Sequence, residues 1–143
     1  MKKFIIPFLI VVLFSFGNQE KALESKLLEV YSIEQTTDIL KDVNRKKYFH
    51  ALVFNSFKIE SVDKKEIINQ YPVVNDFAVS EKDGSITKIS SSQLIDLIKD
   101  NSFNILKLNL DRSLTETNSF RLGNSKTVFH LLSHEQINKI AKQ

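Results

Sequence analysis

The chain has 143 residues, of which 42% are hydrophobic and 26% are charged, so it has room for one globular domain behind a processed leader. Cysteine is absent, which excludes a disulfide scaffold, a thiolate metal site and a cysteine nucleophile. The three glycines are too few for a glycine-rich phosphate loop, and the formal net charge is only +3.

Residues 1–17 have the pattern of a cleaved secretory signal peptide. Two lysines precede an apolar run from Phe4 to Phe16, and this run of about 13 residues suits a signal peptide but is too short to span a bilayer. Ser15 and Gly17 are small residues that favour cleavage before Asn18. We therefore expect a secreted or periplasmic protein, with a retained N-terminal anchor as the alternative. The overall composition suggests a bacterial origin.

Cleavage leaves a chain that is nearly neutral, because the leader holds two of the 20 basic residues and none of the 17 acidic ones. A balanced charge gives no support for a nucleic-acid partner. We expect a flexible segment over residues 18–24 and a single domain over 25–143, with no stable membrane span after cleavage.

Three serines are each followed by a glutamine three residues later, and each pair comes directly after a short apolar stretch. These pairs are Ser32 with Gln35, Ser90 with Gln93, and Ser133 with Gln136. Such capping boxes predict helix starts, because the two side chains satisfy each other's backbone amides. The expected helices cover residues 34–44, 92–100 and 134–142, and a shorter helix capped by Asp63 covers 63–70.

Strands are predicted between these helices. Residues 76–80 and 85–89 flank an Asp-Gly turn and predict a hairpin, and residues 119–122 and 126–132 predict a second one. Residues 48–59 are rich in aromatic and β-branched residues and favour a strand, with a helix left open. Alternating leucines predict a strand over 103–110.

This order of elements predicts an α+β fold. We expect a small, mostly antiparallel sheet of about five strands with three to four helices packed on one face. The side chains expected to be buried together in its core are Leu97, Leu106, Leu108, Leu110, Val128 and Ile140.

Histidine offers the main candidate for chemistry. His130 and His134 are four residues apart and Glu135 follows, which resembles the spacing of a zinc-binding helix. The zinc motif fails in detail, because position 138 is Asn138 and the segment changes from strand to helix at Ser133. A hydrolase or metal-dependent enzyme built on these three residues is therefore the second hypothesis, and no cofactor is expected.

Phe54 and Phe57 are the candidate partner surface. They are three residues apart, so both cannot face inward on one regular strand. Either a bulge intervenes, or one of the two rings is exposed and marks a contact with a partner.

The first hypothesis for function is an exported, non-catalytic domain. Within residues 18–143 there is no serine-hydrolase elbow and no phosphate-binding motif, whereas the leader and a foldable core are both present. The expected partner is another protein or a component of the cell envelope.

Overall fold

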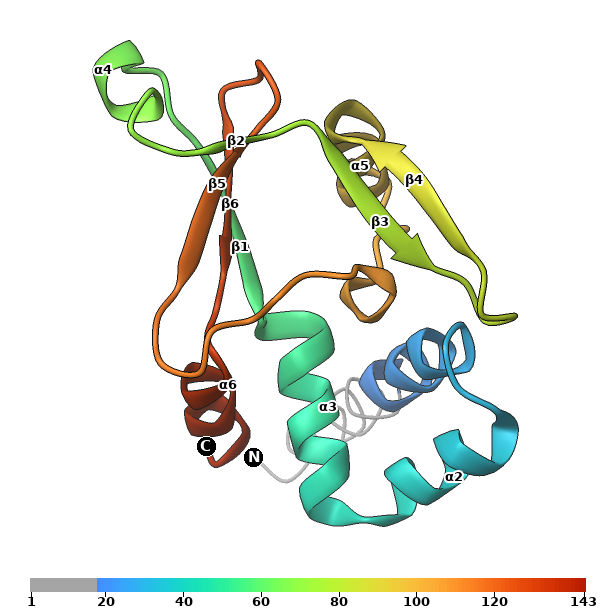
Figure 1. The fold of residues 1–143 in the computed structure, drawn as a ribbon. Helices are drawn as coiled ribbons and strands as arrows, with labels where there is room; N and C mark the ends of the chain where they lie inside the picture. The colour runs from blue at the N-terminus through green and yellow to red at the C-terminus, as the bar shows by residue number, and fades with distance from the viewer. Residues whose placement is uncertain (1–17) are drawn as a thin grey trace, which may run out of the picture.

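The computed structural model describes residues 18–143, and this part of the chain begins with a helix over residues 18–28 (Figure 1). The expectation of a flexible segment over 18–24 is wrong, because Leu23 and Leu27 are 1% and 0% exposed on the inner side of this helix. They pack with Ile39 and Val53 in a small helical core. The predicted signal peptide lies outside the described residues.

Two consecutive helices follow, α2 (Ile33–Lys41) and α3 (Val43–Asn55). The capping box predicted at Ser32 is present, whereas the expected helix over 34–44 ends early because Asp42 caps a new helix. The Asp42 carboxylate accepts the backbone amides of Asn44 and Arg45 at 2.9 and 3.1 Å. The prediction of a strand over 48–59 is therefore wrong for most of that segment.

The main sheet has four strands in the order β1-β6-β5-β2. They are β1 (Phe57–Ser61), β2 (Val73–Val74), β5 (Asn118–Leu122) and β6 (Thr127–Leu131). The β1–β6 and β5–β6 pairs are antiparallel, whereas β2 lies parallel to β5. The predicted second hairpin is confirmed as β5–β6, with Gly123 in its turn at a φ of 57°.

The short helix α4 (Lys65–Ile68) connects β1 to β2. Its N-cap is Lys64, which makes no side-chain cap, so the expected cap at Asp63 is wrong. Asp63 instead forms an ion pair with Lys126 across 3.3 Å.

The first predicted hairpin forms a separate two-stranded sheet of β3 (Asp76–Ser80) and β4 (Ile86–Ser90). Gly84 adopts a φ of 87° in its turn, a conformation that side chains with a Cβ rarely take. Helix α5 (Ser91–Lys99) follows directly and begins with the capping box predicted at Ser90.

The strand predicted over residues 103–110 is wrong. The segment contains a 3₁₀ helix, η1 (Ile105–Lys107), and only Leu108 makes an isolated bridge to Val79 of β3. The Asn104 side chain explains the local turn, because it accepts the amide of Leu106 at 3.1 Å and donates to the carbonyl of Lys26 at 2.9 Å.

The chain ends with α6 (His134–Ala141), which begins with the third predicted capping box, at Ser133. The main core lies between the four-stranded sheet and the β3–β4 hairpin (Figure 1). Its centre is Phe129, which is fully buried and stacks on Phe57 and Phe120 with ring centroids 5.3 and 5.2 Å apart.

The six residues expected to share one core do not do so. Leu108 and Leu110 border the main core, whereas Leu106 joins the helical core. Val128 is buried on the other face of the sheet, Ile140 borders a separate cluster between α3 and α6, and Leu97 is 36% exposed. The leucines separate because the 3₁₀ turn breaks their alternation.

The α+β class is confirmed in part, because the sheets are a mixed four-stranded one and a separate hairpin. The helices do not share one face of the sheet: α2 and α3 lie beyond one end of it, and α5 lies beside the hairpin (Figure 1). Within residues 18–143, no helix combines the length and the apolar character that a membrane crossing requires.

Candidate functional site

His130 on β6 lies between two polar side chains that come from the neighbouring strands. Its Nδ1 atom is 2.7 Å from the hydroxyl oxygen of Ser119 on β5. Its Nε2 atom is 2.8 Å from a carboxylate oxygen of Glu60 on β1. We refer to these three residues as the Glu60–His130–Ser119 array.

The register of the sheet brings the array together. Ser119 on β5 is directly opposite His130. Lys58 on β1 is opposite His130 from the other side, and Glu60 follows Lys58 two residues later on the same face of the strand. Side chains alternate along a strand, so residues next to the buried Phe120 and Phe129 point to the opposite face. The array therefore lies on the outer face of the sheet, away from the main core.

This outer face is covered at one end and open at the other. Val128 is fully buried there against Val62, Ile68 and the ring of Tyr71. The Tyr71 ring also meets the His130 ring edge-on at 6.1 Å. The exposed fraction rises from 20% for the His130 side chain to 57% for Glu60, so the array is accessible from β1.

Arg121 on β5 is a second cation on this face, in addition to Lys58, but its side chain is hydrogen-bonded to the turn after β5. Its guanidinium donates to the backbone carbonyls of Ser125 at 2.8 Å and Asn124 at 3.1 Å. A guanidinium used in this way supports the β5–β6 turn and has fewer donors left for a ligand.

The array can polarise a hydroxyl group. In neutral imidazole one nitrogen donates and the other accepts, so donation from Nε2 to Glu60 leaves Nδ1 to accept the Ser119 proton. Serine-hydrolase triads use the same order of acid, base and hydroxyl, although there the serine meets Nε2 and the acid meets Nδ1. The relation of the two nitrogens is therefore reversed here.

Two cavities of the described chain lie away from the array. One of 360 Å³ lies between α3 and α6, lined by Asn44, Lys47, Tyr48, Asn138, Ala141 and Lys142. Another of 280 Å³ lies between the first helix and α3, beside Leu23 and His50. The array is thus a feature of an accessible sheet face, in contrast to the enclosed pockets that bind small substrates.

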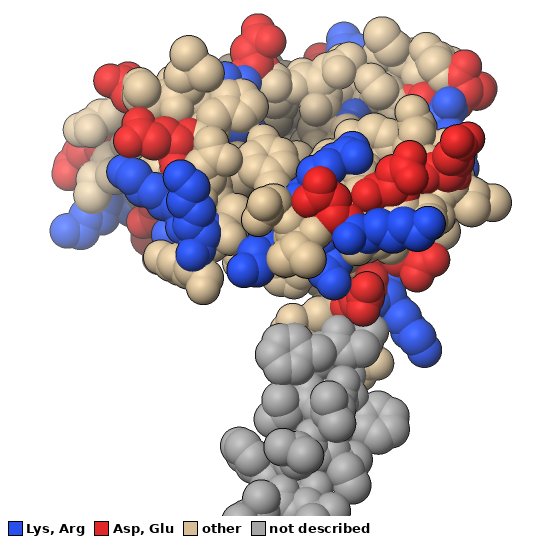
Figure 2. Space-filling view, turned by 90° about the horizontal axis from the view of Figure 1, so that it is seen from below, with Lys and Arg blue, Asp and Glu red and all other residues tan. Residues whose placement is uncertain are grey.

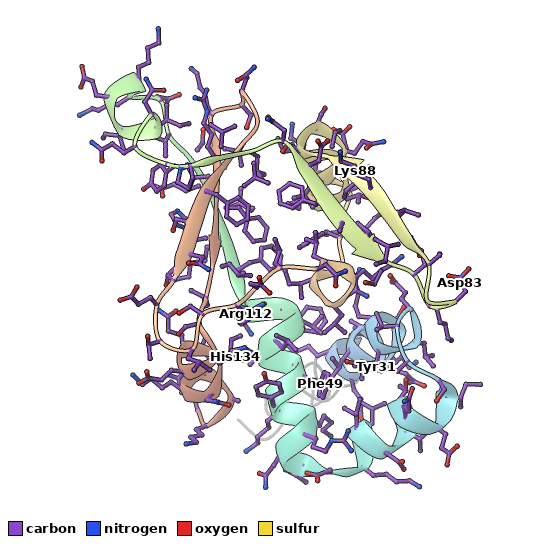
Figure 3. All side chains as sticks on the ribbon, in the orientation of Figure 1. Tyr31, Phe49, Asp83, Lys88, Arg112 and His134 are labelled. Atoms are coloured by element: carbon purple, nitrogen blue, oxygen red, sulfur yellow. The ribbon has the colours of Figure 1, made fainter. Side chains whose placement is uncertain are left out.

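The three residues proposed from the sequence are not brought together. His134 opens α6, where its backbone amide donates to the carbonyl of Ser113 at 3.0 Å, and Figure 3 shows it beside the end of α3. Glu135 forms an ion pair with Lys139 at 3.2 Å. Residues 18–143 contain no group of three or more histidine and acidic side chains placed to hold a metal ion. Of the three, only His130 belongs to the array.

Phe54 and Phe57 do not form a joint surface either. Phe57 lies on β1 and packs edge-on against Phe103 at 5.0 Å. Phe54 lies on α3, is 39% exposed and contacts the ring of His50 at 5.0 Å. The two phenylalanines belong to different elements because the helix ends at Asn55.

Arg112 is a half-buried cation with a structural role. It donates to the backbone carbonyls of Ser56 and Leu132, between the end of α3 and the end of β6 (Figure 3). Burial lowers the pKa of its guanidinium from the ordinary value. Tyr31 is also half-buried: partial burial raises the pKa of its hydroxyl, and its ring meets Phe49 edge-on at 5.9 Å.

Comparison with protein-family models, curated protein sequences and solved structures finds no match for this chain. On the face of the molecule shown in Figure 2, basic and acidic side chains are interspersed. That face therefore has no extended field of a single sign.

Sequence reasoning missed Ser119 and Glu60. The predicted second hairpin includes both Ser119 and His130, so its turn geometry is the one signal that could have suggested their pairing. No pattern in the sequence indicates the position of Glu60, because the strand predicted over residues 48–59 combines part of β1 with residues that form α3.

Proposed function

We propose that this protein is an exported, non-catalytic binding domain of the cell envelope that contacts its partner with the outer face of the main sheet. The observation that supports this proposal is the position of the Glu60–His130–Ser119 array on an accessible sheet face. The apolar run and small residues at positions 1–17 support export.

The shape and chemistry of this face favour a macromolecular partner. Small ligands bind mostly in concave, apolar pockets, whereas an accessible sheet surface offers area and hydrogen-bonding groups to a second large surface. Glu60, His130 and Ser119 provide such groups beside the exposed Lys58. A protein or envelope polymer with matching polar groups fits these properties better than an apolar ligand.

Site-specific photo-crosslinking in the native host tests this proposal. A photoreactive residue replaces Lys58, which faces His130 across the strands, and in a control it replaces Lys99 at the end of α5. We expect a discrete adduct from position 58 whose mass differs from that of two crosslinked copies of this chain, and which is absent from position 99. His130→Ala should reduce this adduct while the thermal unfolding midpoint stays close to that of the parent protein. Equal adducts at both positions, or none at position 58, would contradict the proposal.

A serine hydrolase is the second candidate, and the two short distances in the array favour it. Ser119 Oγ would attack an ester carbonyl carbon while its proton moves to His130 Nδ1. The carbon–oxygen bond to the alcohol then breaks, and the alcohol takes the proton from His130. Water releases the acid from Ser119 in a second step of the same kind.

An active-site-directed fluorophosphonate separates the two candidates. If the protein is a hydrolase, the probe labels Ser119, and both labelling and hydrolysis of a p-nitrophenyl ester fall at least about 100-fold in Ser119→Ala and His130→Gln. Ser92→Ala on the exposed side of α5 is the matched control. If Ser119 is unlabelled and ester hydrolysis is equal in all variants, the hydrolase candidate is excluded.

A further inference from the structure

Strand β1 forms an accessible edge of the main sheet. It pairs only with β6 in the sheet order, and four of its five residues are exposed. The amide of Val62 donates to Lys126 and the amide of Leu132 donates to Ser56, so the even-numbered residues of β1 face β6. In an antiparallel pair the direction alternates, so the backbone groups of Phe57, Ile59 and Ser61 face the outer edge.

The other strand edges are less suited to pairing. β2 has only two residues and follows Pro72, which has no amide hydrogen. The edge of β3 is occupied, because the carbonyl of Ala78 accepts the amide of Asn109 at 3.0 Å. β4 has Lys88 at its centre, and two copies paired about that centre would place like charges opposite each other.

We propose that β1 pairs with β1 of a second copy of the chain, in an antiparallel dimer whose two-fold axis passes through Ile59. The sequence of β1, Phe-Lys-Ile-Glu-Ser, is self-complementary in this register. Lys58 of each copy lies opposite Glu60 of the other, and Phe57 lies opposite Ser61. Opposite charges directly across two strands stabilise the pairing.

The charges select this register over its neighbours. An axis through Lys58 would oppose two lysines, and an axis through Glu60 would oppose two glutamates, which is unfavourable in either case. An axis through Ile59 is also the one that matches the backbone, because Ile59 directs its amide and carbonyl outward. The flanking Lys58 and Glu60 then form a non-hydrogen-bonded pair, in which side chains approach most closely.

Glu60 can serve both contacts, because its Oε2 atom meets His130 and its other carboxylate oxygen is left for Lys58 of the second copy. No ion pair within residues 18–143 uses Lys58. The dimer makes the outer faces of two sheets continuous and places two arrays on one surface. This inference goes beyond the proposed function and does not depend on it.

Sedimentation velocity over a range from about 1 µM to 1 mM tests the pairing on the chain that begins at Asn18. We expect a reversible dimer, and Lys58→Glu should weaken it about tenfold or more, because two attractive pairs become repulsive. The double variant Lys58→Glu with Glu60→Lys restores complementary charges and should recover much of the dimer. Lys139→Glu, a matched charge change on α6, should leave it unchanged.

A variant of the backbone gives an independent test. The amide of Ile59 faces outward, so Ile59→Pro removes a donor from the dimer and none from the β1–β6 ladder. Hydrogen exchange of the unmodified chain should show concentration-dependent protection at Ile59 and Ser61, with Lys58 and Glu60 protected at all concentrations. A protein that stays monomeric at 1 mM, or a dimer insensitive to Lys58→Glu and Ile59→Pro, would overturn the proposal.

Discussion

Serine hydroxyls begin three helices in the same way, but their surroundings differ. Ser133 is 0% exposed, and its backbone amide donates to Gln136 at 2.8 Å while its hydroxyl accepts the Gln136 amide at 3.1 Å. Ser32 forms the same box with Gln35 on an exposed turn. Water can replace a lost hydrogen bond at the exposed cap but not at the buried one.

We therefore expect Ser133→Ala to lower the free energy of unfolding by about 1–2 kcal/mol and Ser32→Ala by about 0.5–1 kcal/mol. Urea denaturation of the two variants, monitored by circular dichroism, measures the difference. His134→Ala should change stability by less than about 0.5 kcal/mol, because the hydrogen bond from His134 to Ser113 uses the backbone amide, which the substitution keeps. Equal losses for the two serine variants would contradict the role of burial.

Asp83 in the β3–β4 turn is an exposed carboxylate whose pKa is lowered by its hydrogen bonds. The Ser85 hydroxyl, 2.6 Å from the carboxylate, lowers the pKa of Asp83, and the Ser85 amide at 2.9 Å adds to the effect. The stabilisation of the turn is therefore present above the ordinary pKa of aspartate and is lost as the pH falls through the lowered pKa of Asp83.

An NMR titration of the Asp83 carboxyl carbon checks this direction. We expect a midpoint below the usual aspartate range in the parent protein and a return toward that range in Ser85→Ala. Ser92→Ala, in a different element, should leave the pKa of Asp83 where it is in the parent protein. A midpoint that does not respond to Ser85→Ala would show that the hydroxyl is not the main cause.

At the scale of elements, the helix over residues 18–28 is part of the folded domain. Its inner side places Leu23 and Leu27 against Ile39 of α2 and Val53 of α3. Lys26 extends this contact to the other half of the chain, because its ammonium donates to the carbonyl of Phe103 at 3.1 Å. The helix therefore joins α2 and α3 to the segment around η1.

Leu23→Ala should lower the free energy of unfolding by about 2–5 kcal/mol, the range for a cavity in a packed core. Glu24→Ala, at an exposed neighbouring position, should change it by less than about 0.5 kcal/mol. Thermal and urea unfolding of the chain that begins at Asn18 measure both variants. A loss below about 1 kcal/mol for Leu23→Ala would mean that this helix is not docked in solution.

At the scale of the whole molecule, Phe129 joins the sheet to the rest of the fold. It stacks on Phe57 and Phe120 from the two flanking strands, and it meets Phe103, ahead of η1, edge-on at 6.2 Å. Aromatic contacts of this kind add to the free energy of burying the rings. A single residue thus contacts three segments that are far apart in the sequence.

Phe129→Ala should lower the free energy of unfolding by about 3–5 kcal/mol, whereas Phe54→Ala at the partly exposed end of α3 should cost clearly less. We expect one cooperative transition in the parent protein, with coincident loss of far-UV and near-UV circular dichroism. Separate transitions for the helical part and the sheet would contradict a core shared through Phe129.

The features that the sequence determined by itself are local ones. The capping boxes at Ser32, Ser90 and Ser133 need only groups three residues apart, so their helix starts could be read directly. The turns at Gly84 and Gly123 also follow from local backbone preference, and both hairpins were predicted correctly.

Only the tertiary structure decided the rest. Residues 48–55 became a helix because the Asp42 cap and packing against the first helix outweigh their β-propensity. The leucines after Asn104 turn because the Asn104 side chain bonds to Lys26, distant in sequence. The array likewise joins positions 60, 119 and 130, whose proximity depends on strand order and register. Long-range pairings of this kind leave no periodic pattern in a single sequence, because the residues around one position do not show which distant residue it contacts.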